Sequence, residues 1–373
     1  MTALARSHGW RGPGQVMGQG SDVQGVSAVL RQLTTRYALY FPDARMSPTI
    51  SSVTVTSRRH CDLAWVELKF DGAAARICVK FPKDPKKRPH THLERVGQDP
   101  SVEFETLSYL HERFRRVPGC AVVRPIALFP EEMAVVTEVA EGNNLHDLIK
   151  RKAGPWCGGS EVEALKAHCL ASGVWLRHFQ EFTAQQRQAA LPMSKILEQV
   201  TADLEVCVQM GLPRAVAFSL LTLCEEQLRT VEGRKVPVVG EHPDFQPDNI
   251  LLSPAGVTVL DFTNFQYGSA YNDVGRFLAS LDFLRKNPLY SRERIHTLKA
   301  AFLEGYGWSR NEMDAGLTAY LIRYMVQATR TARKWSYPNP VKRLLERWAI
   351  GCLSAWCRRA MRMGDACGEH ILG

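Results

Sequence analysis

The chain has 373 residues, which is too many for one small hydrophobic core and suits about two domains or lobes. Its content of 45% hydrophobic and 23% charged residues is typical of a globular protein, and no apolar run approaches the roughly 18–20 residues that cross a bilayer. The formal net charge of +9 suits nucleic acid, acidic lipid or a phosphorylated ligand. Because no zinc finger, RNA-recognition signature or basic zipper accompanies this charge, we expect no nucleic-acid partner.

The N-terminal residues and the cysteines indicate a cytoplasmic protein. Arg6 and Arg11 are not followed by a continuous apolar segment or a cleavage-like site, so a secretory signal is not expected. The ten cysteines are scattered and never paired at zinc-ligand spacing. Reduced core thiols therefore fit better than disulfides or metal ligands. No sequence pattern indicates an oligomeric state.

The first part of the chain changes from a flexible composition to a strand pattern. Residues 1–25 are rich in Gly, Ser and Gln and predict a flexible arm, and residues 26–41 have helical spacing. From about 50 to 82 the pattern is that of strands, with a hairpin turn at Asp71-Gly72. Alternation along the last of these strands predicts one face with Arg76, Cys78 and Lys80 and the opposite face with Ile77, Val79 and Phe81.

After this strand, the segment 81–95 is basic, contains proline and predicts an exposed loop. A helix follows over 101–114, with an apolar stripe that includes Phe104, Leu107 and Leu110, and two further strands follow up to 139. From about 145 to 235, and again from about 272, the pattern is mainly helical. We therefore predict a mostly β N-lobe (26–137), a connector or hinge (138–142) and a mostly α C-lobe (143–373).

One polar stretch interrupts the helical part. In "VVGEHPDFQPDNILL", which ends at Leu252, a histidine, two aspartates and an asparagine lie between apolar runs, and Asp261 follows the strand-like "VTVL". Phosphoryl transfer needs a carboxylate at the acceptor hydroxyl and oxygen ligands for Mg²⁺. Asp244 fits the first role, and Asn249 and Asp261 fit the second. Zinc fits less well, because only His242 stands out locally. Taken alone, the stretch also suits a surface turn.

These residues, "HPDFQPDNILL" and "VTVLDF", resemble the aminoglycoside phosphotransferase and choline kinase family; "YNDVGRFLASL", which contains Asp273, supports this. The resemblance extends more faintly from about residue 50 to about 330. It implies an α+β, bilobal protein-kinase-like fold with a small antiparallel-sheet N-lobe and a larger, mainly helical C-lobe. It also implies ATP and Mg²⁺ as cofactors.

The resemblance assigns roles to individual residues. Asp244 matches the catalytic aspartate, and Asn249 and Asp261 match the Mg²⁺ ligands. His242 and Asp273 match residues that support the catalytic loop.

On the nucleotide side, Lys80 matches the strand lysine that holds the phosphates. Glu103 matches its ion-pair partner, with Glu105 as the competing choice. The backbone groups of Glu138 and Ala140 in "VVTEVAEGNNL" match the hinge that faces adenine. Singly, Lys80 also suits a strand-edge charge, and Glu103 suits an early-helix carboxylate.

The sequence departs from the family pattern at several positions. Pro243 replaces the usual glycine, Thr263 replaces the last glycine of a D-F-G, and no glycine-rich loop lies between the first two strands, where "RRHCD" occurs. Arg58 and Arg59 in that turn suit phosphate contact or a solvated turn. Asp273 follows Asp261 by only twelve positions, which leaves no room for a protein-kinase activation segment and disfavours a peptide acceptor.

The leading hypothesis is therefore an ATP- and Mg²⁺-dependent phosphotransferase that acts on a hydroxyl of a small molecule or glycan. The alternative is a catalytically silent kinase-like module that binds a nucleotide or a partner. The final helix, with Trp348 and Trp356 among arginines, suits a membrane surface less well than a lobe core. No motif identifies the acceptor. Four basic residues suit an acidic or phosphorylated acceptor: Arg323, Arg330, Arg333 and Lys334. Solvated charges on a helix surface explain them as well.

Overall fold

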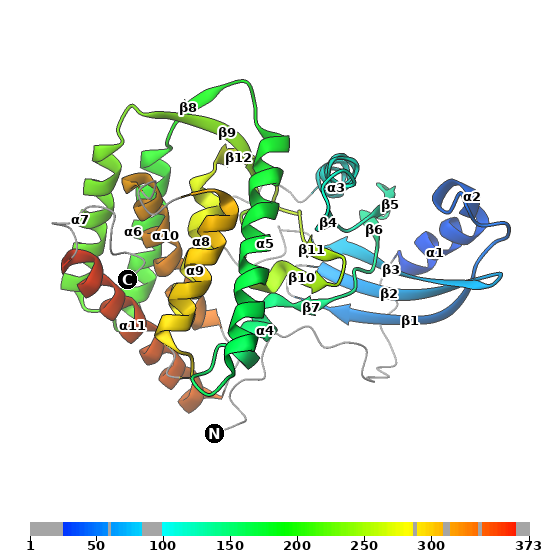
Figure 1. Ribbon diagram of the computed structural model, residues 1–373. Coiled ribbons are helices and arrows are strands. Elements are labelled where there is room, and N and C mark those ends of the chain that lie inside the picture. The colour runs from blue at the N-terminus through cyan, green and yellow to red at the C-terminus, as the bar shows by residue number, and fades with distance from the viewer. Residues whose placement is uncertain are drawn as a thin grey trace. The chain divides into compact units, whose positions relative to one another are not determined.

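The computed structural model describes residues 25–58, 61–83, 99–285, 289–308, 314–334 and 338–362, without the side chains of Lys334 and Arg362. The arm predicted over 1–25, except for Gly25, lies outside these residues, and so does most of the loop predicted over 81–95. The contacts group the chain into two units. The first runs to Asn144 and includes Leu251–Phe265, and the second contains Leu145–Ile250 and the residues from Gln266 onward (Figure 1).

The first unit is built on an antiparallel sheet of five strands in the order β1-β2-β3-β6-β5. These strands are β1 (Thr49–Ser57), β2 (Cys61–Phe70), β3 (Ala73–Pro82), β5 (Pro125–Phe129) and β6 (Ala134–Glu138). The predicted hairpin is present, since Phe70 pairs with Ala73 across the Asp71-Gly72 turn. Gly72 has a φ of 75°, a left-handed conformation that glycine adopts without steric cost.

The helix α1 (Val26–Thr35) shares a hydrophobic core with this sheet. Val29 and Leu33 are fully buried there together with Ile77 and Val79 of β3. The helix predicted over 26–41 is divided, because α2 (Tyr37–Tyr40) begins after a break at Arg36. The hydroxyls of Thr34 and Thr35 just before the break donate to carbonyls in the preceding turn, a bond that bends helices.

The helix α3 (Pro100–Phe114) begins at Asp99, whose side chain accepts a hydrogen bond from the Ser101 N–H. It contacts β5, β6 and a second sheet of four strands in the order β4-β11-β10-β7. These strands are β4 (Cys120–Val122), β7 (Asn143–Asn144), β10 (Ile250–Ser253) and β11 (Gly256–Val259). The hairpin of β10 and β11 carries Asp261 immediately after it, so this residue belongs to the first unit although it is distant from Lys80 in sequence.

The second unit is mainly helical. Its helices are α4 (Leu145–Lys152), α5 (Gly159–Thr183), α6 (Met193–Gln209), α7 (Arg214–Thr230), α8 (Tyr271–Leu284), α9 (Arg292–Tyr306), α10 (Ala315–Thr331) and α11 (Asn339–Arg362). Two short 3₁₀ helices are η2 (Pro247–Asn249) and η4 (Ala332–Lys334). A three-stranded sheet has the order β12-β9-β8, with β8 (Gln188–Ala190), β9 (Lys235–Glu241) and β12 (Gln266–Ser269). The long helix α5 packs along α9, as Figure 1 shows in green and yellow.

The helix α11 packs its tryptophans within the second unit. Trp356 is buried and its indole N–H donates to Asp282 at 3.3 Å, and Trp348 packs edge-on against Phe283. Asp282 also accepts a hydrogen bond from Lys299 at 2.7 Å. The tryptophans that suggested a membrane contact thus face protein here. Within the described residues, no helix has both the length and the apolar character that spanning a membrane requires.

Candidate active site

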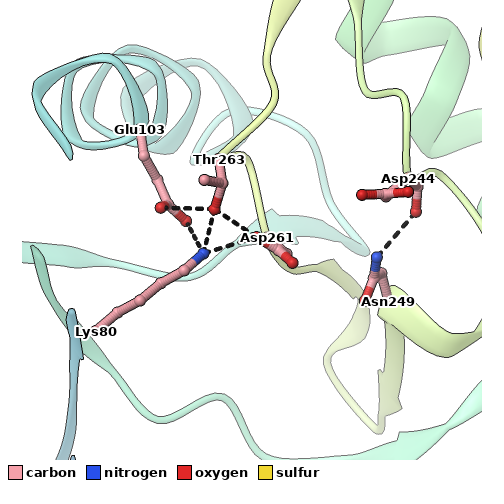
Figure 2. Close-up of polar contacts among 6 residues, drawn as sticks. All are labelled: Lys80, Glu103, Asp244, Asn249, Asp261 and Thr263. Atoms are coloured by element: carbon pink, nitrogen blue, oxygen red, sulfur yellow. Dashed lines mark hydrogen bonds and ion pairs between the residues drawn. The ribbon is translucent and has the colours of Figure 1, made fainter. Parts of the chain in front are cut away.

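Lys80 of β3 lies at the centre of a charged cluster in the first unit. Because Ile77 and Val79 point into the core shared with α1, alternation turns Lys80 to the opposite face of the strand. Its Nζ lies 2.9 Å from Glu103 Oε1 and 2.7 Å from Asp261 Oδ1, and it also donates to the hydroxyl of Thr263 (Figure 2). Glu103 is buried in the first turn of α3, whereas Glu105 is exposed, so Lys80 meets the first of the two candidate glutamates.

The cluster uses the full donor capacity of the ammonium. A lysine ammonium has three N–H donors, and Glu103, Asp261 and Thr263 supply three acceptors. Burial alone would lower the pKa of Lys80, but the carboxylates of Asp261 and Glu103 outweigh burial and raise this pKa above its usual range. Lys80 is therefore a cation held by two carboxylates, with its side chain 16% exposed.

Thr263 joins the three charged side chains. Its Oγ1 lies 2.6 Å from Asp261 Oδ1 and 3.0 Å from Glu103 Oε2 while accepting from Lys80. A hydroxyl has one proton to donate, so at any moment it donates to one of the two carboxylates. The threonine that replaces a family glycine therefore adds a polar partner to this cluster, a contact that no sequence motif signals.

Asp261 has an unusual backbone conformation. Its φ of 68° lies in the left-handed region, which only a few per cent of non-glycine residues adopt, with Asp and Asn the most tolerant. Its side chain is 45% exposed, in contrast to 6% for Glu103. Strained conformations of this kind cluster at functional sites, where the surrounding structure maintains them.

The predicted hinge follows β6 in the same unit. The N–H of Glu138 donates to the Arg124 carbonyl at 2.9 Å, so only the carbonyl of Glu138 remains as a candidate for a base-facing group. Ala140 makes no main-chain hydrogen bond to the described part of the chain. Gly142 approaches β10 so closely that a Cβ there would lie 2.7 Å from the Leu252 carbonyl oxygen. This position requires glycine.

The second unit contains the loop that carries Asp244 and Asn249. β9 ends at Glu241, and Phe245 is fully buried with its ring stacked 5.7 Å from that of Trp175. Asn249 lies at the end of η2 and donates from Nδ2 to the main-chain carbonyl of Asp244 at 2.9 Å (Figure 2). The asparagine side-chain oxygen thereby faces away from that bond and is the atom suited to a metal ion.

His242, at the start of this loop, contacts Asp273. Asp273, in the first turn of α8, accepts the His242 N–H at 3.0 Å and the Gln180 amide at 3.2 Å. Both Asp273 and His242 are buried, and burial, followed by the nearby Glu241 carboxylate, raises the pKa of Asp273 well above its usual value. The two residues to which the sequence assigned a supporting role are thus in direct contact, and the role itself stays a prediction.

Two contacts around the loop were not predicted. Asp248, a turn residue by its sequence, contacts Nδ1 of His146 in α4. Arg276 of α8 places its guanidinium 3.6 Å from the Asp244 carboxylate, whose side chain is 33% exposed. Arg276 follows Asp273 by three residues, so helical periodicity puts both on one face of α8 and was an available signal.

The oxygen ligands in the two units fit magnesium by their chemistry. Mg²⁺ prefers carboxylate and amide oxygens, which Asp261 and Asn249 carry, over imidazole or thiolate. No group of three or more His, Cys, Asp or Glu side chains in the described ranges could hold a metal ion, as a zinc site would require.

The two units match a class of known structures. A proposed aminoglycoside phosphotransferase from Ralstonia eutropha aligns at 13% identity and a TM-score of 0.56, over 91% of this chain and 98% of that chain. A choline/ethanolamine kinase family protein from Mesorhizobium loti (11% identity, TM-score 0.51, 91% and 95%) and a glucosamine kinase (14%, 0.51, 86% and 97%) align similarly. This chain thus has the α+β, bilobal protein-kinase-like fold that the sequence predicted.

The family follows from the sequence itself. The model of the Phosphotransferase enzyme family matches residues 103–316, more than half of the chain, so the chain belongs to that family. The match begins at Glu103 and includes the whole Asp244 loop. No curated protein matches the sequence significantly.

Proposed function

We propose that this protein is an ATP- and Mg²⁺-dependent phosphotransferase whose acceptor is a hydroxyl of a small molecule or glycan. The observation that carries the proposal is the cluster of Lys80 with Glu103, Asp261 and Thr263, because it places a partly buried lysine cation beside a strained and partly exposed aspartate. Membership of the Phosphotransferase enzyme family supports the reaction class.

In the proposed mechanism Lys80 binds the α- and β-phosphates of ATP. Since its three donors are occupied in this structure, a phosphate oxygen must replace one acceptor. Asp261 is the partner that we expect to leave, because its carboxylate is more exposed than that of Glu103 and is a proposed metal ligand. Glu103 then keeps Lys80 in position, and the carbonyl of Glu138 and the backbone of Ala140 face the adenine.

At the acceptor, the carboxylate of Asp244 accepts a hydrogen bond from the hydroxyl and orients its oxygen toward the γ-phosphorus. The new O–P bond forms as the bond between the γ-phosphorus and the β–γ bridging oxygen breaks, ADP leaves, and the hydroxyl proton passes to Asp244. Asn249 and Asp261 are the proposed ligands of Mg²⁺, which neutralises phosphate charge when bound. His242 and Asp273 act through the loop and keep Asp244 in place.

The proposal is tested by Asp244→Ala and measurement of ADP release from ATP and Mg²⁺ across a library of hydroxyl compounds. Loss of a general base or orienting carboxylate typically lowers turnover by about 10²–10⁴-fold. ATP binding, measured by thermal shift, should persist, since Asp244 is not a proposed phosphate ligand. Unchanged turnover in this variant would refute the role of Asp244, and absence of ATP binding by the unaltered protein would refute the proposed function.

A further inference from the structure

Two arginines from different helices lie against one tyrosine ring close to Asp244. Arg276 of α8 and Arg323 of α10 place their guanidinium carbons 5.2 Å and 5.0 Å from the ring centre of Tyr324. Arg323 also lies 5.7 Å from the ring centre of Tyr320. Guanidinium groups bind aromatic faces at such distances, and both rings are buried, so the two arginines are held on a rigid support.

Neutral amides fix both arginines further. Arg323 donates to Asn272 Oδ1 at 3.1 Å, and the same oxygen accepts the Tyr324 hydroxyl at 2.6 Å. Arg276 donates to Gln327 Oε1 at 3.0 Å. These contacts orient the guanidinium groups without neutralising them.

The charge balance of this pair differs from that of two other cations in the second unit, Arg330 and Lys299. Arg330 lies 3.0 Å from Asp203, and Lys299 lies 2.7 Å from Asp282, so each has a carboxylate at hydrogen-bond distance. Within the described ranges, Arg276 pairs with the carboxylate of Asp244 at 3.6 Å, and Arg323 forms no ion pair.

Two further acids, Glu241 and Asp273, lie near the pair, and both are buried. Glu241 accepts hydrogen bonds from the Ser269 N–H at 2.7 Å and from the Gln266 amide at 2.6 Å, and burial raises its pKa. Burial also favours the neutral form of Asp273. The positive charges of Arg323 and then Lys195 act against this rise in the pKa of Glu241, so its carboxylate lies within electrostatic range of Arg323 without forming an ion pair with it among the described residues. Two fixed arginines that share one carboxylate, at 3.6 Å, and otherwise donate to neutral amides keep an excess of positive charge, which favours the binding of an anion.

We infer that Arg276 and Arg323 bind an anionic group, a phosphate or a carboxylate, that the acceptor carries in addition to its reacting hydroxyl. This inference rests on the proposed function, since Asp244 defines where the hydroxyl lies. With ligand contacts of about 2.7–2.9 Å at each end, an anionic oxygen on the Arg276 nitrogen that lies 3.6 Å from Asp244 is at most about 9 Å from the hydroxyl oxygen. A small hydroxylated acid or sugar phosphate spans this distance.

A matched set of acceptors tests the charge preference. Glycerol 3-phosphate, glycerol and 3-amino-1,2-propanediol differ only in the group beside the hydroxyls, and glucose 6-phosphate, glucose and glucosamine form a second set. ADP release by the full-length protein should increase at least about tenfold more with the anionic member than with its neutral or cationic counterparts. Stimulation by the neutral or cationic members alone would overturn the inference and leave the proposed function intact.

Variants test the residues. Arg323→Gln should raise KM for the anionic acceptor by roughly 10- to 100-fold, the loss expected for a charge-assisted hydrogen bond, with a smaller change in kcat. Arg323→Lys should restore part of the affinity, and Arg229→Gln on α7, whose side chain is 70% exposed, is the matched control. If Arg276 instead contacts the phosphates of ATP, Arg276→Gln will lower the slow hydrolysis of ATP without acceptor, and this result would overturn its assignment.

A binding measurement decides the inference even if no tested acceptor is phosphorylated. Inorganic phosphate, added in the presence of saturating ADP and Mg²⁺ to fill the nucleotide site, should raise the Tm of the unaltered protein and of Arg229→Gln. The double variant Arg276→Gln, Arg323→Gln should lose this shift. An equal shift in the double variant, or no shift in the unaltered protein, would show that the pair does not bind an anion.

Discussion

Lys80 in the first unit and Arg323 in the second are both partly buried cations, but their partners differ. Lys80 lies within 3 Å of the carboxylates of Glu103 and Asp261, whereas Arg323 contacts an amide and two tyrosine rings. A cation that is already neutralised must exchange a partner before it binds phosphate. A cation fixed by neutral groups can bind an anion without such an exchange, so Lys80 and Arg323 differ in what anion binding requires.

The largest effect is expected when Lys80, the cation between Glu103 and Asp261, is removed. Lys80→Met leaves Glu103 and Asp261 without the charge that holds them together, and it removes the proposed phosphate ligand. We expect kcat/KM for ATP to fall by about 10²–10³-fold, as for other preorganised phosphate and oxyanion ligands. ADP release measures this, with Lys69→Met, an exposed residue near the end of β2, as control. Turnover at the normal rate would exclude Lys80 from nucleotide binding.

The two candidate glutamates of α3 provide a matched pair with a smaller effect. Glu103→Gln weakens a buried charge-assisted contact, so we expect about a 10- to 100-fold loss of kcat/KM. Glu105→Gln, on the exposed side of the same helix, should remain within about twofold. The comparison is made by ATP titration at fixed acceptor concentration. Equal losses in both variants would contradict a specific role for Glu103.

Thr263 offers a finer test of how the cluster holds Asp261. Thr263→Val keeps the side-chain shape but removes the hydroxyl 2.6 Å from Asp261 Oδ1. Since one hydrogen bond contributes about 0.5–1.5 kcal/mol, the Mg²⁺ concentration for half-maximal turnover should rise by about two- to tenfold. Thr263→Ser keeps the hydroxyl and should behave like the unaltered protein. If Thr263→Ser raised the Mg²⁺ concentration for half-maximal turnover as much as Thr263→Val, the effect would come from packing and not from the hydroxyl.

The smallest effect concerns the support of the Asp244 loop. Burial and Glu241 raise the pKa of Asp273, so the folded state prefers its protonated form. The stabilisation from this protonation is complete below the unfolded pKa of about 3.9 and is lost as pH rises through the higher folded pKa. Thermal unfolding from pH 4 to 8 should therefore show Tm falling more steeply for the unaltered protein than for Asp273→Asn, even if the variant is less stable overall. If Tm changed with pH equally in the two proteins, protonation of Asp273 would not contribute to stability in this way.

Local patterns were enough to predict much of the fold and part of the site. Strand alternation and the Asp71-Gly72 turn placed Lys80 on the face opposite the core, as observed. The spacing of residues on α3 was also enough to choose Glu103 over Glu105. Glu103 lies four residues before Leu107 on the buried stripe, whereas Phe104, which the predicted stripe included, is only half-buried.

Contacts between distant segments were not predictable in this way. In the sequence, Thr263 showed only the loss of a family glycine. Its contacts were not predictable, because its partners come from β3, α3 and the residue two positions before it. The pairing of Arg276 with Arg323 depends on how α8 packs on α10. Periodicity gives the face that a side chain occupies, but tertiary packing decides which side chains meet there.

The packing of α1 also sets a limit on how the protein can be shortened. Val29 and Leu33 are fully buried against the sheet strand that carries Lys80. A shortened form that began after Thr35 would expose the apolar face of β3, including Ile77 and Val79, to water. Exposed apolar sheet faces promote aggregation, so the helix acts as a covalently attached cover whose removal would affect solubility before it affected any chemistry.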